Sequence, residues 1–157
     1  MVKLAGPTLL LTLALAASPA AASDVRIASE GPWTVACSAE EPGDTWCQVG
    51  ISFESVEPPY GLQLNYVRES RMFFAMGAPE PTLVRAHVDN HAPFDLDRCL
   101  AKMCLIKNES AEQLLQQMLN GRSLVVEFVG RHGMPPPFTV DLAGFAPMYR
   151  RALAEPK

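Results

Sequence analysis

The sequence lacks long apolar runs, clusters of positive charge and the common catalytic motifs. Its 13 Lys and Arg are scattered singly among 17 Asp and Glu, which gives a formal net charge of −4. An acidic surface without a basic stripe repels a phosphate backbone, so nucleic acid is a poor candidate partner. The Gly-x-Ser-x-Gly, His-Glu-x-x-His and phosphate-binding glycine-loop motifs are all absent, so no hydrolase or nucleotide site is indicated. We therefore expect a non-enzymatic protein without a cofactor.

The N-terminus has the features of an export signal. Lys3 supplies a positive charge, residues 8–17 form an apolar run, and Ala20-Ala21-Ala22 fits the small-residue pattern that signal peptidase cleaves. The run is about half of the roughly twenty residues that a membrane-spanning helix needs, and no later stretch is long enough. We predict a cleaved Sec signal over 1–22, one domain over 23–157, and a periplasmic or secreted location. A retained N-terminal anchor is the alternative.

Four cysteines in an exported chain of this size indicate two disulfide bridges rather than a metal site. Three pairings are possible, and the spacing favours the two local ones. Cys37 and Cys47 flank a turn-like stretch that would bring two antiparallel strands together. Cys99 and Cys104 enclose only four residues. Each bridge of this loop length contributes roughly 2–3 kcal/mol in the chain-entropy account, so we predict a structural role.

Apolar and polar residues alternate along most of the chain, which is typical of half-buried strands. The alternation predicts a first strand at 33–37, and Cys47, Val49, Ile51 and Phe53 are expected on one face of its partner. About seven or eight strands are expected in all. The fold class is therefore mainly β: an antiparallel β-sandwich or open barrel with one or two short helices and two disulfides. The sequence does not distinguish the sandwich from the barrel.

Two segments have the pattern of helices. In the first, Ser110 and Gln113 have the spacing of a capping box, and an apolar stripe follows up to Asn120. Gly121 is expected to end this helix in the left-handed conformation that glycine tolerates. A final helix is predicted over 145–153.

Histidine and carboxylate residues suggest one alternative function. His87 and His91 lie on either side of Asp89, so the alternative is a small-ligand or metal binder, or an enzyme, that uses these three residues. The segment has the pattern of a strand running into an Asp-Asn turn, which does not bring the two rings together. Surface or turn-stabilising histidines are the simpler interpretation, and no metal is expected.

An apolar run without alternation is the main candidate for a binding surface. Met72, Phe73, Phe74 and Met76 fit either a strand buried on both faces or an edge that binds a partner. The stretch Met134–Pro137 is a second, stiff candidate for docking.

Several of these features together resemble the invasion-associated locus B family. They are the Trp33-Thr-Val-x-Cys37 segment with its second cysteine ten residues on, Arg85-x-x-Val88-Asp89, the Cys99/Cys104 pair, Leu142-x-Gly144-Phe145, and the helix ending at Gly121 before a Val-Val-x-Phe strand. The match covers roughly residues 30 to 154. The chain departs from the pattern at Met103, where the family often has glycine, and lacks a longer insert between Glu54 and Pro81.

The resemblance implies a mainly β envelope protein of a family named for a role in entry into host cells. It implies no catalytic residue. It also implies that Trp33 anchors the core and that Gly144-Phe145 turns into the last helix. We therefore expect a protein that binds another protein, either as an accessory subunit of an envelope or membrane complex or at a host cell. A purely structural assembly factor is the other interpretation. The partner and the oligomeric state do not follow from the sequence.

Overall fold

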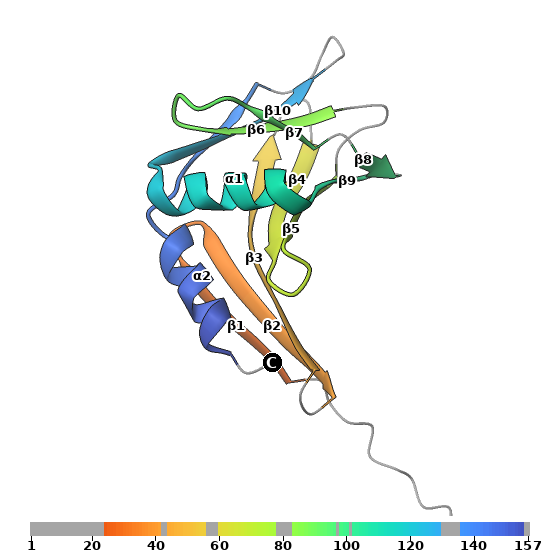
Figure 1. Ribbon diagram of the computed structural model, residues 1–157, viewed down its shortest axis with the longest axis vertical. Coiled ribbons are helices and arrows are strands. Elements are labelled where there is room, and N and C mark those ends of the chain that lie inside the picture. The colour runs from red at the N-terminus through yellow and green to blue at the C-terminus, as the bar shows by residue number, and fades with distance from the viewer. Residues whose placement is uncertain are drawn as a thin grey trace, which may run out of the picture.

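The computed structural model describes residues 24–41, 44–55, 60–77, 83–96, 98–100, 102–129 and 136–155. Within these ranges the chain forms eleven strands and two helices, and every strand pairing is antiparallel. The strands form two sheets, and neither sheet closes into a barrel (Figure 1). The predicted class, a mainly β antiparallel fold with two helices and two disulfides, is therefore confirmed.

The larger sheet has seven strands in the order β1-β2-β3-β4-β5-β9-β8. Their bounds are β1 (Asp24–Glu30), β2 (Trp33–Glu41), β3 (Asp44–Ser55), β4 (Tyr60–Val67), β5 (Met72–Met76), β8 (Arg98–Leu100) and β9 (Met103–Ile106). The first five strands form a meander, because strands that are consecutive in the chain are neighbours in the sheet. This meander places alternate residues of β2, β3, β4 and β5 side by side on each face of the sheet.

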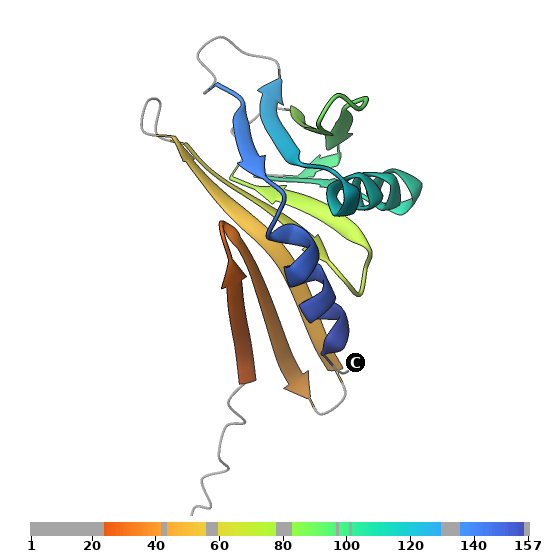
Figure 2. The ribbon, with the colours of Figure 1, turned by 90° about the vertical axis from the view of Figure 1, so that its left-hand side faces the viewer.

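The smaller sheet has four strands in the order β11-β10-β6-β7. Their bounds are β6 (Leu83–Val88), β7 (Phe94–Leu96), β10 (Ser123–Val129) and β11 (Phe138–Asp141). Helix α1 (Asn108–Asn120) contacts both β5 and β6 and so bridges the two sheets. Helix α2 (Phe145–Ala154) packs along β1, β2 and β3, as Figure 2 shows.

The described part of the chain has more strands than the seven or eight expected, because the sequence pattern did not indicate two kinds of strand. Strand β1 precedes the expected first strand at Trp33 and pairs with β2 over its whole length. Strands β7, β8 and β9 have only three or four residues each, too few for alternation to be visible in the sequence. Such short strands are held by their neighbours rather than by their own propensity.

Trp33 anchors the core, as expected. Its ring is 1% exposed and meets the Phe145 ring edge-on, with 4.9 Å between the centroids. The indole Nε1 donates a hydrogen bond to the carbonyl oxygen of Asp141 at 2.8 Å. Gly144 precedes α2 at the point of closest approach, because a Cβ there would lie 2.2 Å from the carbonyl oxygen of Glu30. The first and last parts of the domain are therefore fastened together at this point.

The ends of α1 differ from the prediction. The helix begins at Asn108, two residues before Ser110, and its cap residue Lys107 makes no side-chain hydrogen bond, so the predicted capping box does not form. Gly121 has φ −86° and ψ 178°, which is extended rather than left-handed. Glycine is needed there for space, since a Cβ would lie 2.2 Å from Cγ1 of Val88.

Both predicted disulfides are present. Cys37–Cys47 joins β2 to β3, and Cys99–Cys104 joins β8 to β9; in each case the two cysteines are directly opposite each other in the ladder. Local pairing follows from the hairpins, because each hairpin brings its own two thiols together without any long-range contact.

Candidate functional site

The two faces of the larger sheet differ in composition. On β3 the side chains of Cys47, Val49, Ile51 and Phe53 are buried on the inner face, as predicted. The outer face carries the alternate residues of β2, β3 and β4, which are mostly small or polar. Because these outer residues make no contribution to the core, their identity can serve another purpose.

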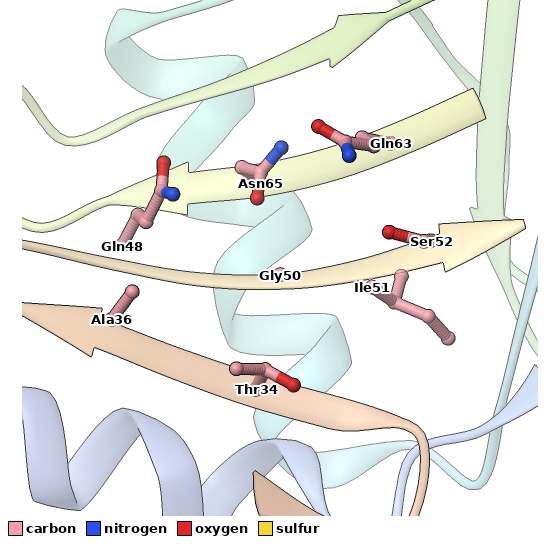
Figure 3. A pocket seen from close by; sticks show the side chains of 8 residues that line it. All are labelled: Thr34, Ala36, Gln48, Gly50, Ile51, Ser52, Gln63 and Asn65. Atoms are coloured by element: carbon pink, nitrogen blue, oxygen red, sulfur yellow. The ribbon is translucent and has the colours of Figure 1, made fainter. Parts of the chain in front are cut away.

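A shallow polar trough of about 220 Å³ lies on this outer face (Figure 3). The side chains that define it are amides and hydroxyls from three adjacent strands, and none of the lining residues is ionisable. The lining residues are Thr34, Ala36, Gln48, Gly50, Ile51, Ser52, Gln63 and Asn65. We call this hollow the polar trough.

Asn65 and Gly50 form the floor of the polar trough. The two residues are opposite each other in the β3–β4 ladder. A Cβ on Gly50 would lie 2.0 Å from Oδ1 of Asn65, so only glycine leaves room for this amide. Asn65 is just 9% exposed. The register places Thr34 on the other side of Gly50, which completes a row across three strands.

The outer face becomes apolar beyond β4. One straight row across the ladder runs from Gln63 to Met76 on β5, then to Met103 on β9 and Leu100 on β8. The side chains of Met76, Met103 and Leu100 are 45%, 37% and 77% exposed. We call these three residues the methionine-leucine patch. Exposed apolar side chains that adjoin one another are characteristic of interaction surfaces.

The patch partly overlaps the predicted binding surface at Met72, Phe73, Phe74 and Met76. Strand β5 is paired on both sides, with β4 and β9, so it is not an edge strand within the described sheet. Phe73 is 1% exposed and belongs to the core, while Met76 is exposed and Met72 and Phe74 are half-buried on the outer face. The burial alternates after all, so only the three outward residues remain available for a partner.

The disulfide Cys99–Cys104 braces the hairpin that carries most of the patch. Leu100 and Met103 form the last pair of the β8–β9 ladder, immediately beyond the two cysteines. The backbone N–H of Gly77 donates to the carbonyl oxygen of Lys102 at 2.9 Å, which ties the hairpin tip to the end of β5. Covalent and backbone links therefore hold in place the backbone that carries the three apolar side chains.

A second hollow, of about 340 Å³, adjoins the polar trough toward the patch. Both hollows are lined by Ser52 and Gln63, so the outer face is recessed continuously from β2 to β5. Met76 and Gly77 line its far end.

The three residues of the alternative ligand site serve turn structure. The carboxylate of Asp89 accepts hydrogen bonds from the backbone N–H groups of Arg122 and Ser123 and from the Ser123 hydroxyl, at 3.0–3.3 Å. The bond from the Arg122 N–H, followed by that from Ser123, holds the pKa of Asp89 below its usual range. The ring Nδ1 of His87 lies 3.1 Å from the carbonyl oxygen of Asp89, and His91 is exposed. Within the part of the chain that the structure describes, no three metal-ligating side chains gather.

One other candidate for docking, Met134–Pro137, lies in part outside the described residues, which resume at Pro136.

Sequence reasoning missed the buried cation Arg68. Its guanidinium is under the C-terminal end of α2 and donates to the carbonyl oxygens of Ala152, Glu155 and Thr45 at 2.6–2.9 Å. It also pairs with Glu69, which accepts the backbone N–H of Cys47. These partners lie far apart in the chain, so no local sequence pattern predicts the contact.

Tyr66, two residues before Arg68, is a second buried ionisable residue. Burial raises its pKa, and the adjacent Tyr149 raises it further, because the charged phenolate would be poorly solvated between the two rings. The ring of Tyr66 packs against Phe73 at 4.9 Å and Tyr149 at 5.7 Å. Tyr66 is therefore a core residue and not a candidate acid or base.

Comparison with known proteins supports the resemblance noted in the sequence. The model of the invasion associated locus B (IalB) protein family matches residues 33–152. Among the solved structures, the chain is similar to the crystal structure of invasion associated protein B from Bartonella henselae, with a TM-score of 0.57 and 16% identity. The similarity covers 82% of this chain and 95% of that chain and shows a shared fold. No curated protein matches the chain. Neither helix in the described ranges is long and apolar enough to cross a membrane.

Proposed function

This chain belongs to the invasion associated locus B family, and from that premise we propose that it is an exported, non-enzymatic envelope protein that binds another protein. The observation that carries the proposal is the methionine-leucine patch. Three large apolar side chains are adjacent and exposed on one rigid part of the sheet. Methionine suits such a surface because its flexible thioether adapts to the shape of a partner.

The contact would be completed by the outward residues next to the patch. Phe74 and Met72 lie half-buried on the same face of β5 and extend the apolar surface toward β4. An interface core of methionine, phenylalanine and leucine with a polar rim has the usual anatomy of a protein–protein contact.

The partner in this proposal is an envelope or membrane protein, which makes the chain an accessory subunit; a role in host-cell interaction is the other version. Export rests on the N-terminal sequence, and we propose that residues 1–22 are removed. Mass spectrometry of the protein isolated from its cells should then give a mature N-terminus at Ser23. Retention of residues 1–22 would contradict the cleaved signal without affecting the binding surface.

Binding is tested by affinity capture of the tagged mature protein from gently solubilised envelope. The triple variant Met76→Ser, Met103→Ser, Leu100→Ser should lose a partner that the native protein retains in stoichiometric amount. The matched control is Ile27→Ser, since Ile27 is 67% exposed on β1, on the same face but at the opposite edge of the sheet.

Two outcomes would overturn the proposal. One is the absence of any stoichiometric protein on the folded native chain. The other is equal capture by the native chain and the triple variant, with circular dichroism showing that both are folded. Loss of the partner in the Ile27→Ser control as well would move the contact away from the patch.

A further inference from the structure

The polar trough has the chemistry of a site for a neutral, hydroxyl-rich ligand. Its lining offers three side-chain amides and two hydroxyls and no ionisable group. An amide carries both donors and an acceptor, and so does each hydroxyl of a sugar. Ions and charged groups would find no counter-charge among these residues, so the lining favours an uncharged ligand.

Asn65 is the least exposed of the polar residues that line the trough. It is 9% exposed, and its side chain makes no hydrogen bond with any residue in the described part of the chain. Among the described residues, the fully buried polar side-chain atom without a partner is Oε1 of Gln117, so the polar atoms of Asn65 keep access to solvent. A ligand can therefore replace solvent as the hydrogen-bond partner of this amide. The side chain lies over Gly50 and faces the trough (Figure 3), and the trough is where a ligand could satisfy it.

An exposed aromatic residue extends the trough along β3. Trp46, Gln48 and Gly50 are alternate residues of this strand, so they share the outer face at intervals of about 7 Å. Trp46 is 37% exposed, whereas Trp33 is in the core. An indole presents an apolar face and one donor, the combination on which the C–H face of a sugar ring packs.

We infer that the polar trough and Trp46 bind a neutral saccharide chain. Trp46 supplies the stacking surface, Gln48 and Gln63 bond hydroxyl or N-acetyl groups, and Asn65 supplies the buried anchor. A peptide strand cannot add here by backbone pairing, because β2, β3 and β4 are already paired on both sides. This site is separate from the methionine-leucine patch, so it does not depend on the proposed protein partner.

The test is a titration of the ¹⁵N-labelled mature protein with two neutral probes, the pentamer of N-acetylglucosamine and the pentamer of glucose. With at least one probe, the side-chain amides of Gln48, Gln63 and Asn65 and the indole N–H of Trp46 should shift. The indole N–H of Trp33, bonded to Asp141, is the internal control and should stay in place.

Variants assign the effect to the trough. Gln48→Met should weaken binding about tenfold, which corresponds to one lost hydrogen bond. Asn65→Leu should weaken saccharide binding at least as much, provided that this variant folds. If it does not fold, Gln48→Met still tests the site, because the Gln48 side chain is half-exposed and its replacement should not disturb the fold. Gln113→Met on the exposed face of α1 is the matched control and should bind like the native protein.

The inference is overturned if neither probe shifts these resonances at millimolar concentration, or if Gln48→Met binds as well as the native protein. It is also overturned if the trough resonances respond only to a captured envelope protein, since the trough would then be part of a protein interface. Loss of the protein partner in the patch variant, with saccharide binding intact, would leave both proposals standing as separate sites.

Discussion

The guanidinium of Arg68 donates a hydrogen bond to the carbonyl oxygen of Ala152 at 2.6 Å, across 84 positions of the chain. A second bond reaches Glu155 and a third reaches Thr45, so one buried cation joins the C-terminal end of α2 to the start of β3. Carbonyl oxygens at the end of a helix lack partners within the helix and carry partial negative charge, which a cation stabilises. Arg68 therefore caps α2 from the side of the sheet.

Replacing Arg68 should be among the most destabilising single changes in the chain. Arg68→Leu removes the cation and its hydrogen bonds to three carbonyl oxygens, and we expect a loss of about 2–4 kcal/mol in the free energy of unfolding. Urea denaturation followed by circular dichroism measures it. Arg150→Leu, on the exposed side of α2, is the control and should change the free energy of unfolding by less than about 0.5 kcal/mol. Equal effects of the two variants would contradict the capping role.

Gly50 should not tolerate a side chain. A methyl group at this position would lie 2.0 Å from the Asn65 Oδ1 atom and 2.9 Å from the carbonyl oxygen of Leu64. We expect Gly50→Ala to cost about 1–3 kcal/mol, the usual range for overpacking, in a thermal or urea unfolding experiment. Gly61→Ala is the matched control on the neighbouring strand, because a Cβ there meets nothing within 4 Å. Comparable losses of stability in both variants would show that any alanine in place of a strand glycine is destabilising, and that the contact with Asn65 is not the reason glycine is needed at position 50.

The two disulfides should differ in their accessibility to reductant. Cys99 is exposed, whereas Cys37 and Cys47 are 3% and 0% exposed. In native buffer, dithiothreitol should therefore reduce Cys99–Cys104 first, as followed by alkylation and mass spectrometry. Replacing both Cys37 and Cys47 with serine should lower the free energy of unfolding by about 2–4 kcal/mol. Earlier reduction of Cys37–Cys47 would mean that this part of the sheet opens more readily than its burial indicates.

Asp89 should make the stability depend on pH in the acid range. Because its pKa is lowered in the folded protein, its contribution is present above the pKa of the unfolded chain, about 3.9, and is lost as the pH falls through the folded value. The native protein should lose more thermal stability between neutral pH and about pH 3 than Asp89→Asn does. The substitution suits the backbone, since residue 89 has φ 47° and asparagine tolerates that conformation.

Scanning calorimetry across this pH range measures the effect. Glu109→Gln, whose side chain is exposed on α1 and bonded only to Gln113 among the described contacts, serves as the control. If the melting temperatures of the native protein and Asp89→Asn fall in parallel as the pH is lowered, the prediction is wrong. The hydrogen bonds from Arg122 and Ser123 would then not favour the charged form of Asp89 over the neutral form.

Features that depend on neighbouring residues could be predicted from the sequence. The disulfide pairs followed from their short spacings, and the last helix was placed to within one residue of its end at Ala154. The buried face of β3 followed from strict alternation, because in a strand with one buried face an apolar side chain must recur at every second residue.

The recessed outer face could not be predicted in the same way. Thr34, Gln48 and Asn65 meet only through the register of three strands, and a shift of one residue would send each side chain to the opposite face. Their pattern is that of any solvated strand face. The predicted C-terminal cap of α1 was wrong for a related reason. Gly121 packs against Val88 at that end of the helix, and this contact between distant residues cannot be read from the sequence.

Helix α2 also sets the order in which the domain can be completed. The inner surface of β1, β2 and β3 belongs to a part of the chain that is synthesised early, but the residues that cover it begin at Phe145, after the last described strand. Until those residues are made, Trp33 has neither its ring partner nor the carbonyl acceptor of Asp141. We expect the nascent protein to stay open, with an uncovered apolar sheet, until α2 has been synthesised. Folding would then follow synthesis instead of accompanying it.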